Sequence, residues 1–405
     1  MTDRPPANAH DFAKLLRIQK RKIERKRKRA ANPARAVRII TQSPPPAGPR
    51  AGSVWRWSDG RLTFFNLSLD SRHELVEEEV RSLQAEEIAG ALVSRQRDPL
   101  LPLRTFSGAV YGADGHIVPE FRERDGLTQH RWNRRLNLPV MERARIEAAE
   151  RSDETSVYLG RWSHRFGHFL LESLACAWYL TKDDGPTPLL FHSWSDRLIV
   201  PPFAQVILKA LGVQPSRIRV VSSRDLLVDK LILPASQFWP GTRASPGMCT
   251  VFDHVRERML AVRTSKGQTP AKVYLTRRAF EADRADVQPD ILIRNEEEAE
   301  TFFRGQGYEI VQPELMDFEE QVAVVANATH VAGTSGSALH MMLFNANPKA
   351  KLIELRTKPA MNQLLIGHIR GYQSFHVSSL VESPHSGGRT LDMGVVERAA
   401  REIGG

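Results

Sequence analysis

Residues 331–355, VAGTSGSALHMMLFNANPKAKLIEL, constrain the fold more than any other stretch of the chain. An apolar run ends at Gly333, and four small or hydroxylated residues follow from Thr334 to Ser337. A helical pattern, a turn containing proline and a second apolar run come next. A strand, a turn, a helix and a strand at this short spacing predict a βαβ unit and hence a parallel sheet.

Similar alternation runs through most of the chain, with short apolar runs such as PLLFH, IRVV, KLILP and KVYL separated by helical patterns. A chain of 405 residues exceeds what one hydrophobic core usually supports, so we expect two α/β domains facing a cleft. The segment 240–248, PGTRASPGM, has the composition of a linker between two domains. The predicted division is a basic arm and Pro-rich linker at 1–50, a first α/β domain at 51–245, a second α/β domain at 246–380, and a C-terminal helix at 381–405 that could pack back on the first domain.

The net charge of +10 is concentrated in the N-terminal arm. Residues 1–50 hold 14 Lys and Arg against 3 Asp and Glu, whereas the other residues hold 43 against 44. The basic residues gather between Lys14 and Arg38. Such a run can lie on an anionic membrane or glycan, grip nucleic acid, or remain solvated. It has no interleaved aromatic residues, so nucleic acid is the least expected partner.

Two features bear on the compartment. No apolar run approaches the roughly 20 residues that span a bilayer, and the first residues lack a secretory pattern. Cys176 and Cys249 provide neither a disulfide framework nor a metal-ligand spacing. We therefore expect a cytoplasmic protein, which the arm could hold at the inner face of the membrane.

The turn after Gly333 has the features of an anion site. Backbone amides at a helix start have no intrahelical partners, and small residues let a phosphate approach them. The hydroxyls of Thr334, Ser335 and Ser337 add donors, and Glu354 at the next strand end could bind ribose hydroxyls. An ordinary tight turn beside an incidental surface acid is the alternative. A nucleophile elbow is disfavoured, because the final glycine and a downstream acid–histidine pair are missing.

Two further groups could contribute to a site. His168 and Glu172 are four residues apart in GHFLLESLACAWYL, so on a helix they would share a face and could act as a base and its partner, in either order, or pair structurally in the core. Arg277 ends the strand KVYLTRR, where parallel sheets bind ligands and a guanidinium can clamp phosphate. The alternative is an exposed arginine pair with Arg278.

Three blocks in this order, FGHFLLESLACAW, the run from VYLTRR through VAGTSGSALHMMLF, and KLIEL, resemble glycosyltransferase family 61 over about residues 155–360. The resemblance implies a GT-B fold, a nucleotide-sugar donor held by the second domain, inversion at the anomeric carbon, and neither a metal nor another cofactor. It assigns catalysis to His168 and Glu172. Donor binding falls to Arg277, Gly333, Thr334, Ser335, Gly336, Ser337, Ala338, His340 and Glu354, with support from Asn295, Glu296 and Gln321. Many relatives have His at the position of Ser335 and Thr-Asn at His340-Met341.

The resemblance therefore implies an inverting, metal-independent glycosyltransferase that moves a sugar from a nucleotide-sugar, with a UDP-sugar favoured, to a glycan acceptor in capsular, exo- or lipopolysaccharide biosynthesis. The alternative hypothesis is a non-catalytic binding protein, in which a degenerate glycosyltransferase scaffold is recruited to anionic glycan, membrane or nucleic acid by the arm.

Overall fold

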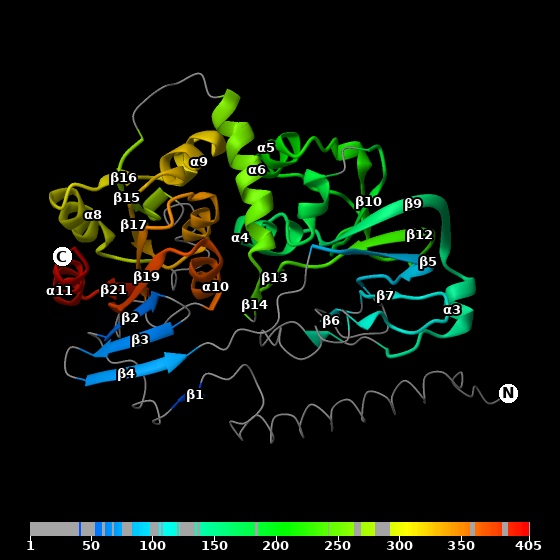
Figure 1. Ribbon diagram of the computed structural model, residues 1–405, viewed down its shortest axis with the longest axis horizontal. Helices are drawn as coiled ribbons and strands as arrows, with labels where there is room; N and C mark the ends of the chain where they lie inside the picture. Colours follow the sequence, from blue (N-terminus) through cyan, green and yellow to red (C-terminus); the bar gives the residue numbers. More distant parts are fainter. Residues whose placement is uncertain are drawn as a thin grey trace.

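The computed structural model describes residues 40–41, the strands within 53–74, and residues 83–404 except 98–104, 107, 120, 122–133, 136–137, 183–184, 242, 263–268, 280–291, 357–360 and 383–387 (Figure 1). Two large β-sheets with helices packed around them make up this part, which confirms the α/β class. The basic run at 14–38 lies outside the described residues, so its roles remain predictions. No helix in the described part is both long and apolar enough to cross a bilayer.

The nine-stranded sheet is built around five parallel strands. They lie in the order β16-β15-β17-β18-β19, with bounds Glu309–Val311, Lys272–Leu275, His330–Thr334, Lys351–Arg356 and Gln373–Ser378. The chain passes from β15 outward to β16 and then crosses to the other side of β15 to form β17. The strand order therefore reverses between β15 and β17, and doubly wound folds bind ligands at such a switch point, outside the carboxyl ends of the strands.

The central strands of this sheet are buried on both faces, as parallel strands usually are. Val331 and Leu352 enter a core with α9 (Phe318–Ala326), the 3₁₀ helix η7 (Ser337–Phe344) and α10 (Met361–Arg370). The alternate residues Ala332 and Ile353 enter a second core with α8 (Glu296–Gly305) and α11 (Met393–Gly404). The period-2 alternation thus places helices on both sides and leaves the carboxyl edge of the sheet for a site.

The six-stranded sheet also contains parallel strands whose order reverses within the sheet. Its order is β11-β10-β9-β12-β5-β7, with bounds Ile218–Val221, Leu189–His192, Glu150–Arg161, Leu226–Pro234, Ala85–Val93 and Val110–Tyr111. Strands β9 to β12 are parallel, and β5 is antiparallel to both of its neighbours. Here the order reverses between β9 and β12, so a second switch point lies where β9 ends at Arg161.

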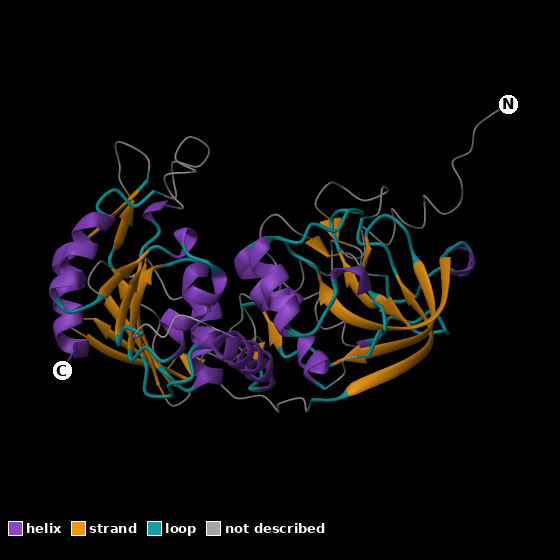
Figure 2. Cartoon of the chain, turned by 90° about the horizontal axis from the view of Figure 1, so that it is seen from above, coloured by secondary structure: helices purple, strands orange, loops and turns teal. Residues whose placement is uncertain are grey.

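Helix α6 (Gly247–Val262) stands between the two halves (Figures 1 and 2). It packs against η3 (Ala177–Thr181) of the first half and against α9, η7 and α10 of the second. One hydrophobic cluster contains residues of both sheets, including Leu159 of β9 and Val331 of β17. The remaining elements are β1 Ile40–Thr41, β6 Thr105–Phe106, β8 Arg134–Arg135, β13 Phe238–Trp239, β14 Arg243–Ala244, β20 Leu380–Glu382, β21 Arg389–Leu391, α3 Arg143–Glu147, α5 Pro202–Ala210, η4 Pro215–Arg217 and η6 Pro313–Leu315.

Two boundaries in the predicted division are corrected by the strand pairing. Strands β2 (Ser53–Ser58), β3 (Arg61–Asn66) and β4 (Leu69–Glu74) extend the C-terminal sheet, because β2 pairs antiparallel with the edge strand β19. Alternating residues predict a strand but not its sheet. The C-terminal helix α11 packs on β19 and α8 of this same sheet, and not back on the first half.

Two segments that the sequence predicts as regular α-helices differ in winding. The stretch beginning at Gly167 divides into a turn of α-helix, α4 (Phe166–His168), a π-helical turn, η2 (Phe169–Ser173), and η3. The segment after Gly336 is wound as the 3₁₀ helix η7. A π-turn inside a helical segment frequently accompanies a functional site, and here it contains Glu172.

Candidate functional site

The carboxyl ends of β15 and β17 bring Arg277 to the Gly-Ser turn. The Arg277 Nη1 donates a hydrogen bond to the Ser335 carbonyl at 2.7 Å. A Cβ placed on Gly336 would lie 3.1 to 3.2 Å from the guanidinium atoms, so Arg277 lies directly against the turn. The structure therefore joins these two predicted parts of the site, and Arg278 does not share the position, because its guanidinium bonds Glu300 at 3.0 Å.

The Glu296 carboxylate links the ends of strands β15 and β17. This carboxylate is 1% exposed and accepts hydrogen bonds from Thr334 Oγ1 at 3.0 Å, Tyr274 Oη at 3.3 Å and the Arg277 backbone amide at 3.3 Å. Strands β15 and β17 contribute these donors, and α8 contributes the acceptor. Glu296 thus sets the spacing of the switch point, which fits the supporting position predicted for it.

The turn itself offers fewer donors than its sequence predicts. The Thr334 hydroxyl is taken by Glu296, and the Ser335 amide donates to the Leu355 carbonyl at 2.9 Å. The first hydrogen bond of η7 runs from the Leu339 amide to the Gly336 carbonyl. The amides of residues 336–338 come before this bond and therefore have no partner within the helix. Those three amides, with the exposed Ser337, are the part of the turn that can face an anion.

Gly333 is required by close packing of the strand end. A Cβ there would lie 2.7 Å from the Leu275 carbonyl oxygen and 3.2 Å from Leu339 Cδ2. Any side chain would push β17 away from β15. This glycine therefore keeps the switch point narrow enough for Arg277 to reach Ser335.

His168, Glu172 and Arg161 form the second group of polar residues, at the end of β9. The Glu172 carboxylate contacts His168 Nδ1 through Oε1 and accepts from Arg161 Nη1 through Oε2 at 3.3 Å. Because an ionised carboxylate only accepts, the histidine Nδ1 is the donor. The side chain of His168 is 49% exposed and that of Glu172 is 17% exposed. The predicted pairing of these two residues is confirmed.

Arg161 is a residue that the sequence reasoning did not select. Burial lowers its pKa, and the neighbouring Glu172 carboxylate opposes that shift. Its guanidinium also lies 5.8 Å from the centroid of the Trp194 ring. The signal that could have found it is the one used for Arg277, since both arginines stand where a parallel strand ends.

The two groups meet at Gly167. A Cβ on Gly167 would lie 2.7 Å from Ser337 Cβ and 3.1 Å from His340 Nδ1, so α4 rests against the first turn of η7. Residue 167 precedes His168, and Ser337 belongs to the Gly-Ser turn. The structure therefore places the His168–Glu172 pair of one sheet beside the turn of the other, which spacing along the chain could not show.

His340 faces both groups. Burial lowers its pKa to about 4, an effect that the Glu354 carboxylate opposes and that His168 adds to. Among the described residues, its Nδ1 has no hydrogen-bond partner. The imidazole is therefore neutral near pH 7, and its charge cannot neutralise a phosphate there.

Glu354 lies where predicted, beside Gly333 in the parallel register, but it is only 1% exposed. Its Oε1 accepts from Arg356 Nη1 at 2.8 Å, and its Oε2 contacts His376 Nδ1 at 2.6 Å. His376 is itself buried and bonds Ser374 Oγ through Nε2 at 3.0 Å. Ribose could reach this carboxylate only by replacing one of these partners.

Asn295 and Gln321 act at a distance from the turn. The Asn295 amide group exchanges hydrogen bonds with the backbone of Leu391, which ties the start of α8 to β21. Gln321 Nε2 donates to the carbonyls of Pro313 and Met316 and so holds η6 against α9. Both contacts are structural.

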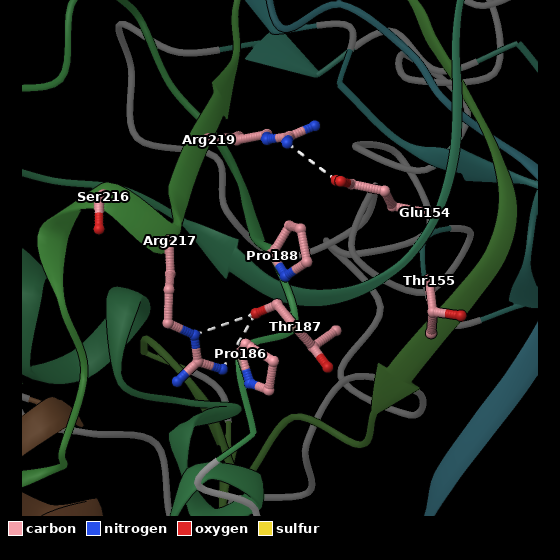
Figure 3. A pocket seen from close by; sticks show the side chains of 8 residues that line it. All are labelled: Glu154, Thr155, Pro186, Thr187, Pro188, Ser216, Arg217 and Arg219. Carbon is pink, nitrogen blue, oxygen red and sulfur yellow. Dashed lines mark hydrogen bonds and ion pairs between the residues drawn. The ribbon is translucent and has the colours of Figure 1, made fainter.

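An open hollow of about 490 Å³ lies elsewhere, lined by Glu154, Thr155, Pro186, Thr187, Pro188, Ser216, Arg217 and Arg219 (Figure 3). Its two arginines are engaged, with Arg219 on Glu154 and Arg217 on the Thr187 carbonyl. The lining residues Pro188 and Arg217 precede β10 and β11, so the hollow borders the amino-terminal ends of these strands. Ligands of parallel sheets bind at the opposite edge.

In the described part of the chain, no three His, Cys, Asp or Glu side chains converge as metal ligands would. The doubly wound sheets and the site at their carboxyl edges are consistent with a Rossmann-like glycosyltransferase. Residues 166–353 match the family model described as Glycosyltransferase 61. This match supports the predicted resemblance to glycosyltransferase family 61 and indicates that the protein is a glycosyltransferase. No curated protein of known function matches it.

Proposed function

We propose that the protein is an inverting, metal-independent glycosyltransferase that moves a sugar from a nucleotide-sugar, preferably a UDP-sugar, to a hydroxyl of a glycan acceptor. The observation that supports this most is the packing of α4 against η7 at Gly167, which puts the His168–Glu172 pair beside the Gly-Ser turn and Arg277. The two sheets would then be the two halves of a GT-B fold, and the acceptor would bind to the half that contains His168.

In this mechanism His168 is the base. Its Nδ1–H is held by Glu172, so the neutral ring carries its lone pair on Nε2, and Glu172 stabilises the imidazolium after proton transfer. The acceptor oxygen loses its proton to Nε2 and attacks the anomeric carbon. The bond from that carbon to the phosphate oxygen breaks on the opposite side, and its electron pair leaves with the nucleoside diphosphate, so the configuration inverts.

The leaving diphosphate gains negative charge as this bond breaks. In this proposal the diphosphate lies between the Arg277 guanidinium, which borders the turn, and the amides of residues 336–338, so the charge develops beside fixed donors. Fixed donors in such a place stabilise the transition state more than the ground state. This arrangement needs no metal ion to neutralise the diphosphate.

UDP-binding and kinetic measurements on substituted variants test the site. Arg277→Ala should weaken UDP binding roughly 10- to 100-fold, since it removes a charge-assisted contact to phosphate. Arg278→Ala, a matched change at an exposed neighbour, should alter it by less than about 3-fold. His168→Ala should lower kcat by about 10² to 10⁴ with little change in KM. Wild-type activity in His168→Ala, Arg277→Ala and Glu354→Ala together would reject the site.

A place in capsular, exo- or lipopolysaccharide biosynthesis at the cytoplasmic face of a membrane is part of this proposal, with residues 14–38 as the membrane contact. The alternative is a binding protein recruited by the arm. Removal of residues 1–38 and a nucleotide-stabilisation assay distinguish it from a glycosyltransferase. A glycosyltransferase without its arm should keep UDP binding while losing salt-sensitive binding to anionic vesicles. If no nucleotide stabilises the full chain against heat, the binding-protein alternative is favoured.

A further inference from the structure

Gln363 in the first turn of α10 has an unusual environment. It is 1% exposed, and neither its Oε1 nor its Nε2 has a hydrogen-bond partner within the described residues. Buried amides are almost always paired, because an unmade hydrogen bond away from water is destabilising. A glutamine that leaves both a donor and an acceptor unpaired is therefore suited to a partner outside the protein chain.

The location of Gln363 is the ligand edge of the sheet. Strand β18 ends at Arg356 and α10 begins at Met361, so the first turn of α10 lies at the carboxyl edge. The neighbouring Asn362 accepts a hydrogen bond from the Gly241 amide at 2.7 Å. Gly241 lies between β13 and β14, so this turn also borders the segment that connects the two sheets.

Gln363 is also level with the start of η7. Both helices leave the carboxyl edge and pack side by side, and Arg370 of α10 donates to the Leu343 carbonyl of η7. We count back from this contact along each helix, seven residues from Arg370 in α10 and five residues from Leu343 in η7. With rises of about 1.5 Å per residue for an α-helix and about 2.0 Å for a 3₁₀ helix, both distances are about 10 Å. These steps lead to Gln363 and Ala338. Equal rises from the Arg370–Leu343 contact therefore bring the first turn of α10 level with the first turn of η7, where the Nδ1 of His340 is also unpaired among the described residues.

We propose that Gln363 binds the nucleobase of the nucleotide-sugar, with Oε1 accepting from and Nε2 donating to a base edge that presents a donor beside an acceptor, as the imide edge of uracil does. The inference rests on the proposed function, since it requires the diphosphate to lie at residues 336–338. Glu354 is already paired with Arg356 and His376, whereas both polar atoms of the Gln363 side chain are unpaired among the described residues.

Calorimetric titration of the full chain tests the inference with three probes: UDP, N3-methyl-UDP and inorganic pyrophosphate. Gln363→Leu, which keeps the volume, should weaken UDP binding roughly 10- to 100-fold and leave pyrophosphate binding unchanged. Wild type should prefer UDP to N3-methyl-UDP, and the variant should not distinguish them. The variant without ligand should melt no lower than wild type, because it loses an unpaired buried amide. Gln205→Leu, at an exposed helical position, is the control.

The outcomes separate the two proposals. If wild type binds neither UDP nor pyrophosphate, the proposed function fails and this inference with it. If wild type binds both but Gln363→Leu binds UDP equally well, or loses UDP and pyrophosphate in the same proportion, the assignment of Gln363 is overturned while the proposed function stands. Equal affinity of wild type for UDP and pyrophosphate would also overturn it.

Discussion

Replacing Glu296 by alanine should destabilise the protein and loosen the site at the same time. The carboxylate is 1% exposed and holds donors of Thr334, Tyr274 and Arg277 at 3.0 to 3.3 Å. Thr334 and Tyr274 are themselves buried, so water would not replace the hydrogen bonds that their hydroxyls make to Glu296. A buried donor left unsatisfied costs about 1 to 3 kcal/mol.

The lower end of that range applies, because two of the three bonds are longer than an ideal hydrogen bond. Three donors at about 1 kcal/mol each give roughly 3 kcal/mol of lost stability. With an unfolding entropy of ~2.1 cal/mol/K per residue, a chain of this size would melt about 4 °C lower. Since the same bonds position Arg277 and the turn, UDP affinity should fall as well.

Urea unfolding and UDP titration of Glu296→Ala check this estimate against Glu297→Ala. The Glu297 side chain is 77% exposed and reaches Arg278 only at 3.8 Å, so its removal should change stability by less than about 0.5 kcal/mol. The reasoning is refuted if the two variants unfold alike, or if Glu296→Ala stays within about 0.5 kcal/mol of wild type.

Two other changes probe the contact between the halves. Gly167→Val should lower kcat/KM by about 10²-fold, since its Cβ would meet Ser337 at 2.7 Å and displace the paired groups by about 1 Å, whereas Gly305→Ala, which meets no atom, should be silent in kinetics. Lowering the pH from 6.5 toward 4 should destabilise the protein by up to ~1.4 kcal/mol per unit through His340, because the unfolded imidazole takes up a proton before the folded one, whose pKa is about 4. Urea unfolding of His340→Gln should show a flatter pH dependence in this window, and an unchanged slope would contradict the assignment.

The sequence predicts the local elements around residues 331–355 well, because apolar runs and small residues report directly on strands and turns. Gly333, Arg277 and Glu354 all lie at the predicted edge. The winding of η7 could not be predicted, since a 3₁₀ and an α-helix use similar residues. Nor could the partners of Glu354, because His376 lies 22 residues further along the chain and becomes its neighbour only through strand pairing.

Contacts between segments far apart in the sequence are harder to predict than local elements. Strand patterns at 53–74 do not reveal that β2 pairs with β19, since that choice depends on which sheet has an open edge. The approach of Gly167 to Ser337 depends on the packing of two sheets. Gln363 is inconspicuous in the sequence, and only burial without a partner distinguishes it. Such residues become visible only when every buried polar atom is matched with its partner.

A crystal structure of the full chain with UDP tests the central claim most directly. The account predicts the β-phosphate within hydrogen-bond distance of Arg277 and of the amides of residues 336–338, with the imidazole Nε2 of His168 on the side from which an acceptor would approach. A diphosphate bound elsewhere, for example in the hollow beside Arg217, with Arg277 still on the Ser335 carbonyl, would contradict it.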